Sequence, residues 1–264
     1  MSKTVVSIQG LSIVREGRTI LSIQDLRIEQ NARIVVLGAN GSGKSTLLSV
    51  LSARLWPSSG NISMLGSHFG SVDLRLLRSR IGLVAAGLAR SLDARMTARE
   101  VIFTGSDGAL APWWSEYSEA TIAAADQLVA GMEKSLGHEL GSRPFVQLSE
   151  GERQQVLLAR MEMQAPELVL LDEPFAGLDL GARERLMLQL EESRWLQGGA
   201  PAVLVTHHVE EIPRGTTQLL ILAEGRVLAS GDPRSVLNSE NLRDAFGIDV
   251  SIAHLNGRFA LQSP

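Results

Sequence analysis

The first part of the chain changes from a strand-like to a helix-like pattern of apolar and polar residues. Residues 5–30 contain short runs, such as VVSIQGLSIV and ILSIQDLRI, in which apolar and polar side chains alternate. This alternation is typical of half-buried strands, so we expect an antiparallel opening sheet. Residues 33–51 then read as an apolar run, a glycine-rich stretch and a helical pattern. That order predicts a buried strand that enters a helix through a tight loop.

The rest of the chain predicts a helical region followed by further buried strands. Residues 57–66 (PSSGNISMLG) indicate a turn and a strand, and residues from about 94 to 163 are mostly helical in pattern. Two apolar runs, LVLL and AVLV, follow with the helical stretch ERLMLQLEE between them, and QLLILAEGRVLASG indicates a last hairpin. Buried strands that alternate with helices predict an α/β core. The tail beyond about residue 240 is uninformative.

Composition favours a chain that buries a core and stays in water. The 264 residues are 44% hydrophobic and include no cysteine, which excludes a disulfide framework, a thiolate zinc site and a cysteine nucleophile. The net charge of −4 argues against a nucleic-acid partner. The sequence has neither a signal-peptide pattern nor a run of roughly 18 apolar residues, so we expect a cytoplasmic location.

The glycine-rich stretch GANGSGKST fits the pattern of a phosphate-binding loop, with a predicted strand before it and a helix after it. Its glycines let backbone N–H groups turn inward, and the helix N-terminus adds positive potential. Lys44 can reach the β- and γ-phosphates, and Ser45 can offer a hydroxyl to Mg²⁺. The alternative is a glycine turn that merely starts a helix. The predicted ATP-binding residues of the loop are Gly38, Ala39, Asn40, Gly41, Ser42, Gly43, Lys44, Ser45 and Thr46.

Two carboxylates follow the next buried run, in LVLLDEP. Asp172 and Glu173 therefore lie at the carboxyl edge of the predicted sheet, where ligands of open α/β folds bind. Asp172 can hold Mg²⁺, directly or through water, and Glu173 can act as the general base that accepts a proton from the attacking water. The alternative is a solvated strand end before a turn. The phosphate-binding loop upstream favours the metal and base roles.

The segment LSEGE, residues 148–152, precedes another helical pattern. Ser149 and Glu152 have the spacing of a capping box, which gives a purely structural interpretation. A compatible interpretation is an anion site, because Gly151 lets a phosphate approach the backbone N–H groups at an exposed helix N-terminus.

The order GANGSGKST, LSEGE, LVLLDEP, GLD at 177–179 and THH at 206–208 resembles the motif order of the ATP-binding cassette (ABC) ATPases, whose signature LSGGQ looks like LSEGE. The resemblance covers about residues 5–237. It implies an α/β fold with a P-loop NTPase (RecA-like) core, a mainly parallel sheet, an N-terminal antiparallel β subdomain and an inserted α-helical subdomain at about 90–163. The ATPase domain would span residues 1–240, and residues 241–264 would form a tail of unknown role.

The resemblance also implies a head-to-tail dimer, either a homodimer or a heterodimer with a related cassette. The phosphate-binding loop of one chain and Ser149 and Gly151 of the other would enclose one ATP. Asp179 resembles the D-loop aspartate that communicates across the dimer. His207 matches the switch histidine that contacts the γ-phosphate, and His208 competes for that role. The implied cofactors are ATP and Mg²⁺, and the implied catalytic residues are Glu173, His207 and Lys44.

Two positions depart from the family pattern. Arg15 stands where the family usually has an aromatic residue that stacks on adenine. A guanidinium plane can also stack on a base, so we hypothesise that Arg15 covers adenine; the alternative is a solvated strand arginine. Ala86 stands where a glutamine helps to position Mg²⁺ and relays movement to a membrane partner. Alanine can do neither, so slower hydrolysis or altered coupling is expected.

The leading function is the ATP-hydrolysing subunit of an ABC transporter, peripheral on the cytoplasmic face of the membrane and bound to separate transmembrane permease subunits. Some cassettes of molybdate and iron-complex uptake look similarly altered. Trp113 and Trp114 in the helical lobe suit either a permease interface or buried packing. Alternatives are a soluble cassette for regulation or repair, slightly favoured by Ala86, and a module that barely hydrolyses ATP. A small P-loop kinase would not need LSEGE.

Overall fold

One ten-stranded sheet runs through the molecule. The computed structural model describes residues 3–108, 110–112, 117–193 and 199–262. Across the sheet the strands follow the order β5-β4-β1-β2-β10-β9-β3-β8-β7-β6. The strand bounds are β1 Thr4–Arg15, β2 Arg18–Glu29, β3 Arg33–Leu37, β4 Ser59–Met64, β5 Ser67–His68, β6 Ile81–Val84, β7 Leu168–Asp172, β8 Ala202–Thr206, β9 Gln218–Ala223 and β10 Arg226–Gly231.

Five strands of this sheet form its parallel core, in the order β9, β3, β8, β7 and β6. Their apolar runs are buried on both faces. In β7, for example, Val169 and Leu171 pack into the cluster that includes the helical lobe, whereas Leu168 and Leu170 pack into the cluster that includes α1. The five strands end at the same edge of the sheet, so the residues that follow them meet there. The predicted buried α/β core is confirmed.

The N-terminal strands form an antiparallel arm. β1 pairs antiparallel with β2 and with β4, and the alternating burial of β1 and β2 places one face of each on the core. The register of the arm with the rest of the sheet is a single parallel pair, Arg226 with Ser22, between β10 and β2. The predicted antiparallel opening sheet and the last hairpin, β9–β10, are both confirmed.

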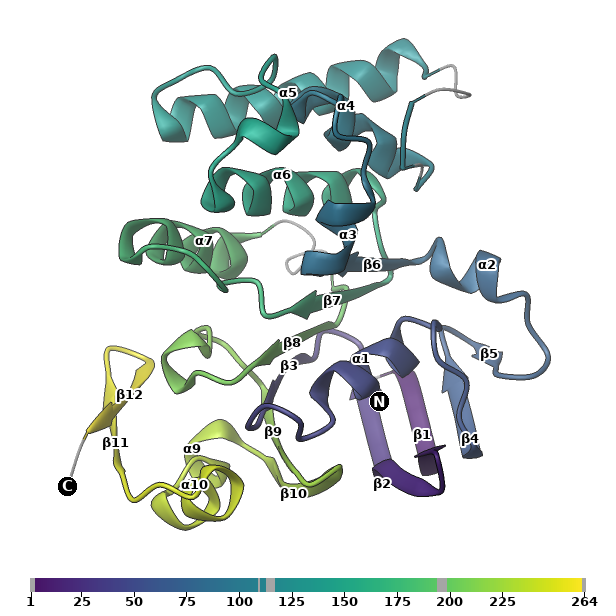
Figure 1. Cartoon of the computed structure of the whole chain (residues 1–264), viewed down its shortest axis with the longest axis vertical. Coiled ribbons are helices and arrows are strands. Elements are labelled where there is room, and N and C mark those ends of the chain that lie inside the picture. The colour runs from purple at the N-terminus through teal and green to yellow at the C-terminus, as the bar shows by residue number, and fades with distance from the viewer. Residues whose placement is uncertain (1–2, 109, 113–116, 194–198, 263–264) are drawn as a thin grey trace.

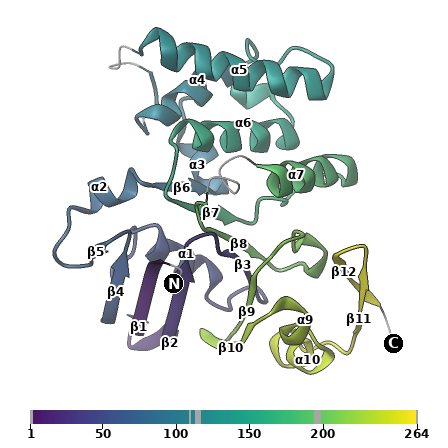
Figure 2. The same cartoon turned by 180° about the vertical axis from the view of Figure 1, so that it is seen from behind.

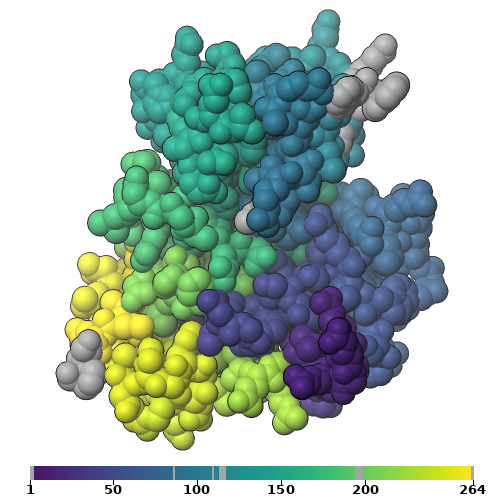
Figure 3. Space-filling model, in the orientation of Figure 1, coloured from purple at the N-terminus to yellow at the C-terminus, as the bar shows by residue number. Residues whose placement is uncertain are grey.

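The longest helices, α5, α6 and α7, lie toward one end of the molecule (Figure 1). Figures 1 and 2 show α4, α5 and α6 as a separate lobe at one end, with α7 beside it, and the space-filling view shows the same lobe standing over the sheet (Figure 3). The helix bounds are α1 Lys44–Leu51, α2 Leu74–Arg78, α3 Ala86–Ser91, α4 Ala98–Phe103, α5 Glu119–Leu136, α6 Glu150–Met163, α7 Leu180–Glu192, α9 Pro233–Val236 and α10 Ser239–Phe246, with 3₁₀ turns η1 Thr104–Ser106, η2 Phe145–Gln147 and η3 Val209–Glu211. No helix among the described residues is long and apolar enough to cross a membrane.

The end of the chain, whose residues show no clear pattern in the sequence, forms a helix and a hairpin. Helix α10 begins at the Asn238 cap, and a two-stranded hairpin, β11 Ser251–Leu255 and β12 Arg258–Gln262, follows it. The hairpin packs Phe259 and neighbouring apolar side chains against the core, and Arg258 forms an ion pair with Glu184 of α7 at 2.5 Å. In Figure 1 the hairpin lies beside the sheet, next to the segments that follow β8.

Candidate functional site

The phosphate-binding loop lies between β3 and α1, as predicted. Gly41 and Gly43 have φ values of 81° and 101°, which side chains with a Cβ rarely adopt. At Gly38 a Cβ would lie 2.4 Å from the Leu222 carbonyl oxygen, so only glycine fits there. The Ser42 hydroxyl is buried and has no hydrogen-bond partner among the described residues. A loop of this shape with an unpaired buried hydroxyl fits a phosphate group, whose oxygens accept hydrogen bonds.

The lysine of the loop is held inward. Lys44 is only 5% exposed, and its Nζ donates hydrogen bonds to the carbonyl oxygens of Gly38 at 2.7 Å and Ala39 at 2.9 Å. Burial lowers the pKa of Lys44, and the nearby charges of Glu173 and Asp172 partly oppose that shift. The loop therefore concentrates positive charge at the place where a polyphosphate would bind.

The acidic pair stands at the end of β7, across from the lysine. Burial raises the pKa of Asp172, Glu173 raises it further, and Lys44 lowers it. Glu173 has a φ of 47°, and its backbone N–H donates to the Val205 carbonyl at 2.9 Å, which fixes its direction at the sheet edge. A glutamate in this left-handed conformation carries local strain, and such strain is common at active sites.

The histidine that follows β8 meets this glutamate. His207 Nδ1 lies 3.1 Å from Glu173 Oε1, and both side chains are about one third exposed, at 33% and 34%. The His208 ring contacts the His207 ring at a tilt of 41°, with ring centroids 4.0 Å apart, and the His208 backbone N–H donates to Thr206 Oγ1 at 3.0 Å. Of the two neighbours, His207 is thus the one that contacts Glu173. Because β3, β8 and β7 are parallel neighbours, they bring together Lys44, Asp172, Glu173 and His207.

The candidate magnesium ligands lie on both sides of this edge. Ser45 is exposed at the start of α1, and Asp172 ends β7. Hydroxyl and carboxylate oxygens suit Mg²⁺, which usually keeps several waters and binds with the phosphates of its substrate. The described residues contain no cluster of three or more acidic, histidine or cysteine side chains that could hold a metal alone. These two residues therefore fit a metal that arrives with nucleotide.

The LSEGE segment starts α6 in the helical lobe. Ser149 is the exposed N-cap of α6, and it forms a capping box with Glu152, so the structural interpretation of this motif is confirmed. A Cβ at Gly151 would lie 3.0 Å from the Ala182 side chain of α7. Among the described residues, no hydrogen bond joins Ser149 to the phosphate-binding loop of the same chain. The start of α6 therefore presents an exposed serine at the surface of the helical lobe.

Asp179 and Arg15 occupy two further exposed positions. Asp179 caps α7, with its carboxylate accepting from the Ala182 N–H at 2.7 Å. The next residue, Leu180, is 74% exposed, which is high for a large apolar side chain. Arg15 ends β1 opposite Arg18, at the exposed tip of the β1–β2 hairpin. Both predicted site residues are accessible from outside.

Gly225, in the turn between β9 and β10, joins the arm to the phosphate-binding loop. Its N–H donates to the Ser42 carbonyl at 3.0 Å, and its carbonyl accepts from the Ser22 N–H at 2.7 Å. Its φ is 74°, and a Cβ there would lie 2.3 Å from the Ile20 carbonyl oxygen. The sequence predicted this hairpin but not its junction role, because the only signal is a glycine in an ordinary turn.

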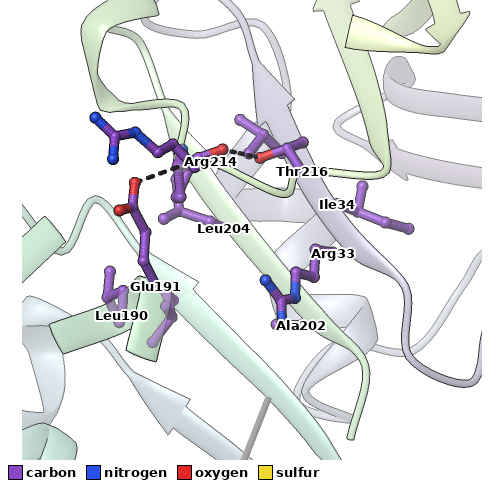
Figure 4. Close-up of a pocket in the computed structure, with 11 residues that line it drawn as sticks. Arg33, Ile34, Leu190, Glu191, Ala202, Leu204, Arg214 and Thr216 are labelled. Carbon is purple, nitrogen blue, oxygen red and sulfur yellow. Dashed lines mark hydrogen bonds between the residues drawn. The ribbon is translucent and has the colours of Figure 1, made fainter. Parts of the chain in front are cut away.

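Other positions contribute less to the site. Ala86 is the first residue of α3, and only its N-cap residue Ala85 separates it from the end of β6. Trp113 and Trp114 lie outside the described residues. A small cavity of about 30 Å³ opens beside the beginnings of β3 and β8, at the opposite edge of the sheet, where Glu191 accepts a hydrogen bond from the Arg214 backbone N–H (Figure 4). It has room for roughly one or two waters and is too small for a nucleotide.

Comparisons with known proteins agree with this geometry. The family model described as ABC transporter matches residues 21–176. The chain is 32% identical over 256 residues to an uncharacterized ABC transporter ATP-binding protein, YmeB, of Lactococcus lactis, with 97% of each chain covered. It is 34% identical over 262 residues to the hemin import ATP-binding protein HmuV of Myxococcus xanthus, with 96% of this chain and 93% of that protein covered.

A solved structure gives the same result for the fold. The cbiO1 protein of Clostridium perfringens, part of the ABC transporter complex cbiONQ, superposes with a TM-score of 0.73 at 27% identity, and the match covers 91% of this chain and 93% of that one. These matches exclude a small P-loop kinase and support none of the alternatives outside transport. The chain therefore belongs to the ABC transporter family, as an ATP-binding subunit that hydrolyses ATP.

Proposed function

We propose that two copies of the chain, or this chain and a related cassette, close head to tail over two Mg²⁺-ATP. In each site the loop from Gly38 to Thr46 holds the phosphates, while Ser149 and Gly151 of the opposite copy complete the enclosure. The proposal rests on one observation: the residues that would form one ATP site lie in two different parts of the same chain. Lys44 and the acidic pair gather at the sheet edge, whereas the start of α6, the candidate anion site, is exposed elsewhere on the same chain.

The roles of the residues follow from their positions. Glu173 accepts a proton from the attacking water, and His207, 3.1 Å away, orients that carboxylate and contacts the γ-phosphate. Lys44 binds the β- and γ-phosphates. Mg²⁺, held by Ser45 and Asp172, would neutralise charge on the phosphates. Asp179, exposed beside the start of α6, transmits the state of one site to the other.

In the proposed cycle, closure of the two copies over ATP is the step that drives transport. ATP favours the closed dimer because it contacts both copies there, and loss of the γ-phosphate removes much of that differential binding. We propose that separate transmembrane permease subunits use this cycle and that the chain sits at the cytoplasmic face of the membrane. Similarity to a hemin import ATP-binding protein supports import of an iron complex as the transported class. Purification from membranes together with a permease, and loss of iron-complex uptake when the chain is deleted, test this assignment.

Ser149→Asp tests the enclosure by a second copy. Aspartate caps a helix about as well as serine, so the thermal unfolding midpoint should change little. Its negative charge would face the γ-phosphate of the opposite site, so ATPase turnover should fall by about tenfold or more, while ATP binding to the monomer is kept. Ser118→Asp, at the N-cap of α5, is the matched control. Unchanged turnover in Ser149→Asp would show that this serine is only a cap.

Arg15→Ala tests the adenine contact. If the guanidinium stacks on the base, ATP affinity should fall by about three- to tenfold, since an exposed cation–π contact contributes about 0.5–1 kcal/mol and a desolvated one about 2 kcal/mol. Arg18→Ala, on the facing strand of the same hairpin, should have little effect. Calorimetric titration with ATP measures both. Equal affinities for the two variants and the unmodified protein would leave Arg15 as a solvated strand residue.

A further inference from the structure

The Glu152 carboxylate at the start of α6 has more donors around it than a helix cap requires. Glu152 is only 8% exposed. Its Oε2 accepts a hydrogen bond from the Ser149 backbone N–H at 2.7 Å, which completes the capping box. Its Oε1 accepts a hydrogen bond from Arg143 Nη1 at 2.8 Å and lies 2.7 Å from His138 Nε2. A capping box needs only the contact with Ser149 on the carboxylate side, so the cap alone does not account for Arg143 and His138.

This carboxylate is charged although it is buried. Burial raises the pKa of Glu152, but hydrogen bonds from His138, Ser149 and Arg143 outweigh that effect and lower it to about 2. A full negative charge therefore lies in the first turn of α6, next to Ser149 and Gly151, where the proposed function places a nucleotide phosphate. An unbalanced carboxylate there would occupy the positive potential of the helix N-terminus and repel the phosphate.

Both acidic residues of this first turn have a cationic partner. Glu150 pairs with Arg153 of the same helix at 3.2 Å, and Glu152 pairs with Arg143 and His138. Because the guanidinium is charged at every relevant pH, Arg143 is the permanent counterion of Glu152. The start of α6 can thus carry two carboxylates and still present a nearly neutral surface to an anion.

Arg143 also connects the start of α6 to the rest of the helical lobe. Its carbonyl accepts a hydrogen bond from the Ala98 N–H at 3.0 Å, at the beginning of α4, and its Nη2 reaches the Gln147 carbonyl at 3.4 Å. His138 lies directly after Gly137, the residue that ends α5. Arg143 and His138 therefore connect the start of α6 to the beginning of α4 and the end of α5.

We propose that Arg143 and His138 are positioning residues for Ser149 and Gly151 at the start of α6. Arg143 neutralises the Glu152 carboxylate and both side chains orient it, so that this helix start accepts a nucleotide phosphate bound to a second copy. This inference rests on the proposed head-to-tail dimer. It assigns a role in ATP-driven pairing to residues that touch neither ATP nor the phosphate-binding loop of their own chain.

A double-variant cycle tests the electrostatic part of the proposal. Arg143→Ala leaves the Glu152 charge uncompensated, so the ATPase turnover should fall by about tenfold or more. ATP affinity of the monomer and the KM for ATP at high protein concentration should change little. Adding Glu152→Gln to Arg143→Ala removes the charge but keeps the capping geometry, because glutamine also completes a capping box. Turnover of the double variant should return to within about threefold of the single variant Glu152→Gln.

The controls separate positioning from general loss of structure. Arg99→Ala breaks the exposed pair with Asp126 in the same lobe and should leave turnover unchanged. If Arg143→Ala does not fold, Arg143→Gln, which removes the charge but keeps a hydrogen-bond donor, replaces it in the cycle with the same Glu152→Gln partner. A double variant that is no more active than its Arg143→Ala or Arg143→Gln parent overturns the proposal.

A separate measurement tests the dimer on which the proposal rests. Turnover per molecule of the unmodified chain should rise with protein concentration, as expected when two copies form each site. Turnover independent of protein concentration would overturn the dimer and the positioning role together. A concentration-dependent unmodified chain with no rescue in the double variant would overturn the positioning role alone.

Discussion

Glu173→Gln should bind ATP normally and hydrolyse it about 10²- to 10⁴-fold more slowly, the range over which a positioned general base contributes. Glutamine has nearly the same shape but cannot accept the proton of the attacking water. In the proposed cycle hydrolysis opens the pair, so the variant should accumulate as a dimer when ATP and Mg²⁺ are present. Single-turnover hydrolysis and size-exclusion chromatography with ATP measure the two effects.

Glu224→Gln is the matched control for this variant. Glu224 has a φ of 48°, against 47° for Glu173, so both substitutions replace a glutamate in the same left-handed conformation. Glu224 is exposed in the β9–β10 turn, and its substitution should leave hydrolysis unchanged. A Glu173→Gln variant that hydrolyses ATP at the normal rate would remove Glu173 as the base.

Lys44→Ala should lower ATP affinity by about 100-fold or more. The ammonium group is the cation held inside the loop, and each charge-assisted hydrogen bond that it makes to phosphate contributes about 1.5–3 kcal/mol. The substitution also leaves the carbonyls of Gly38 and Ala39 without their donor and removes the positive charge beside Asp172 and Glu173. Calorimetric titration with Mg²⁺-ATP measures the loss.

The chain has three lysines, and Lys134 is exposed on α5, far along the sequence from the loop. Lys134→Ala should therefore bind ATP as the unmodified protein does. Circular dichroism establishes that Lys44→Ala keeps its secondary structure before affinity is compared. An affinity within about threefold of normal in a folded Lys44→Ala would show that the loop binds phosphate through backbone N–H groups alone.

The core of the fold could be predicted from the sequence because its signals are local. The run at 168–171 is apolar at every position, and the structure buries all four residues between two apolar clusters. The loop from Gly38 to Thr46 lies where a strand meets a helix, which its pattern requires. In both cases the residues that form the feature are adjacent in the chain, so the pattern can be recognised without knowledge of tertiary contacts.

The features that the sequence did not predict depend on contacts between distant segments. The β11–β12 hairpin is short and is held by apolar packing and by the pair of Arg258 with Glu184, 74 positions away. Arg143 and His138 contact Glu152 only in the folded chain, and their proposed role depends on these contacts. In a single sequence, nothing distinguishes such residues from exposed charges.

The junction at Gly225 bears on how the nucleotide is held. The β1–β2 hairpin, which includes Arg15, and the loop from Gly38 to Thr46 are joined by two backbone hydrogen bonds of this glycine. If Arg15 covers adenine and the loop binds the phosphates, as proposed, this junction sets the spacing between the two contacts. A nucleotide with a longer or shorter link between its base and its terminal phosphates would then make only one of the two contacts.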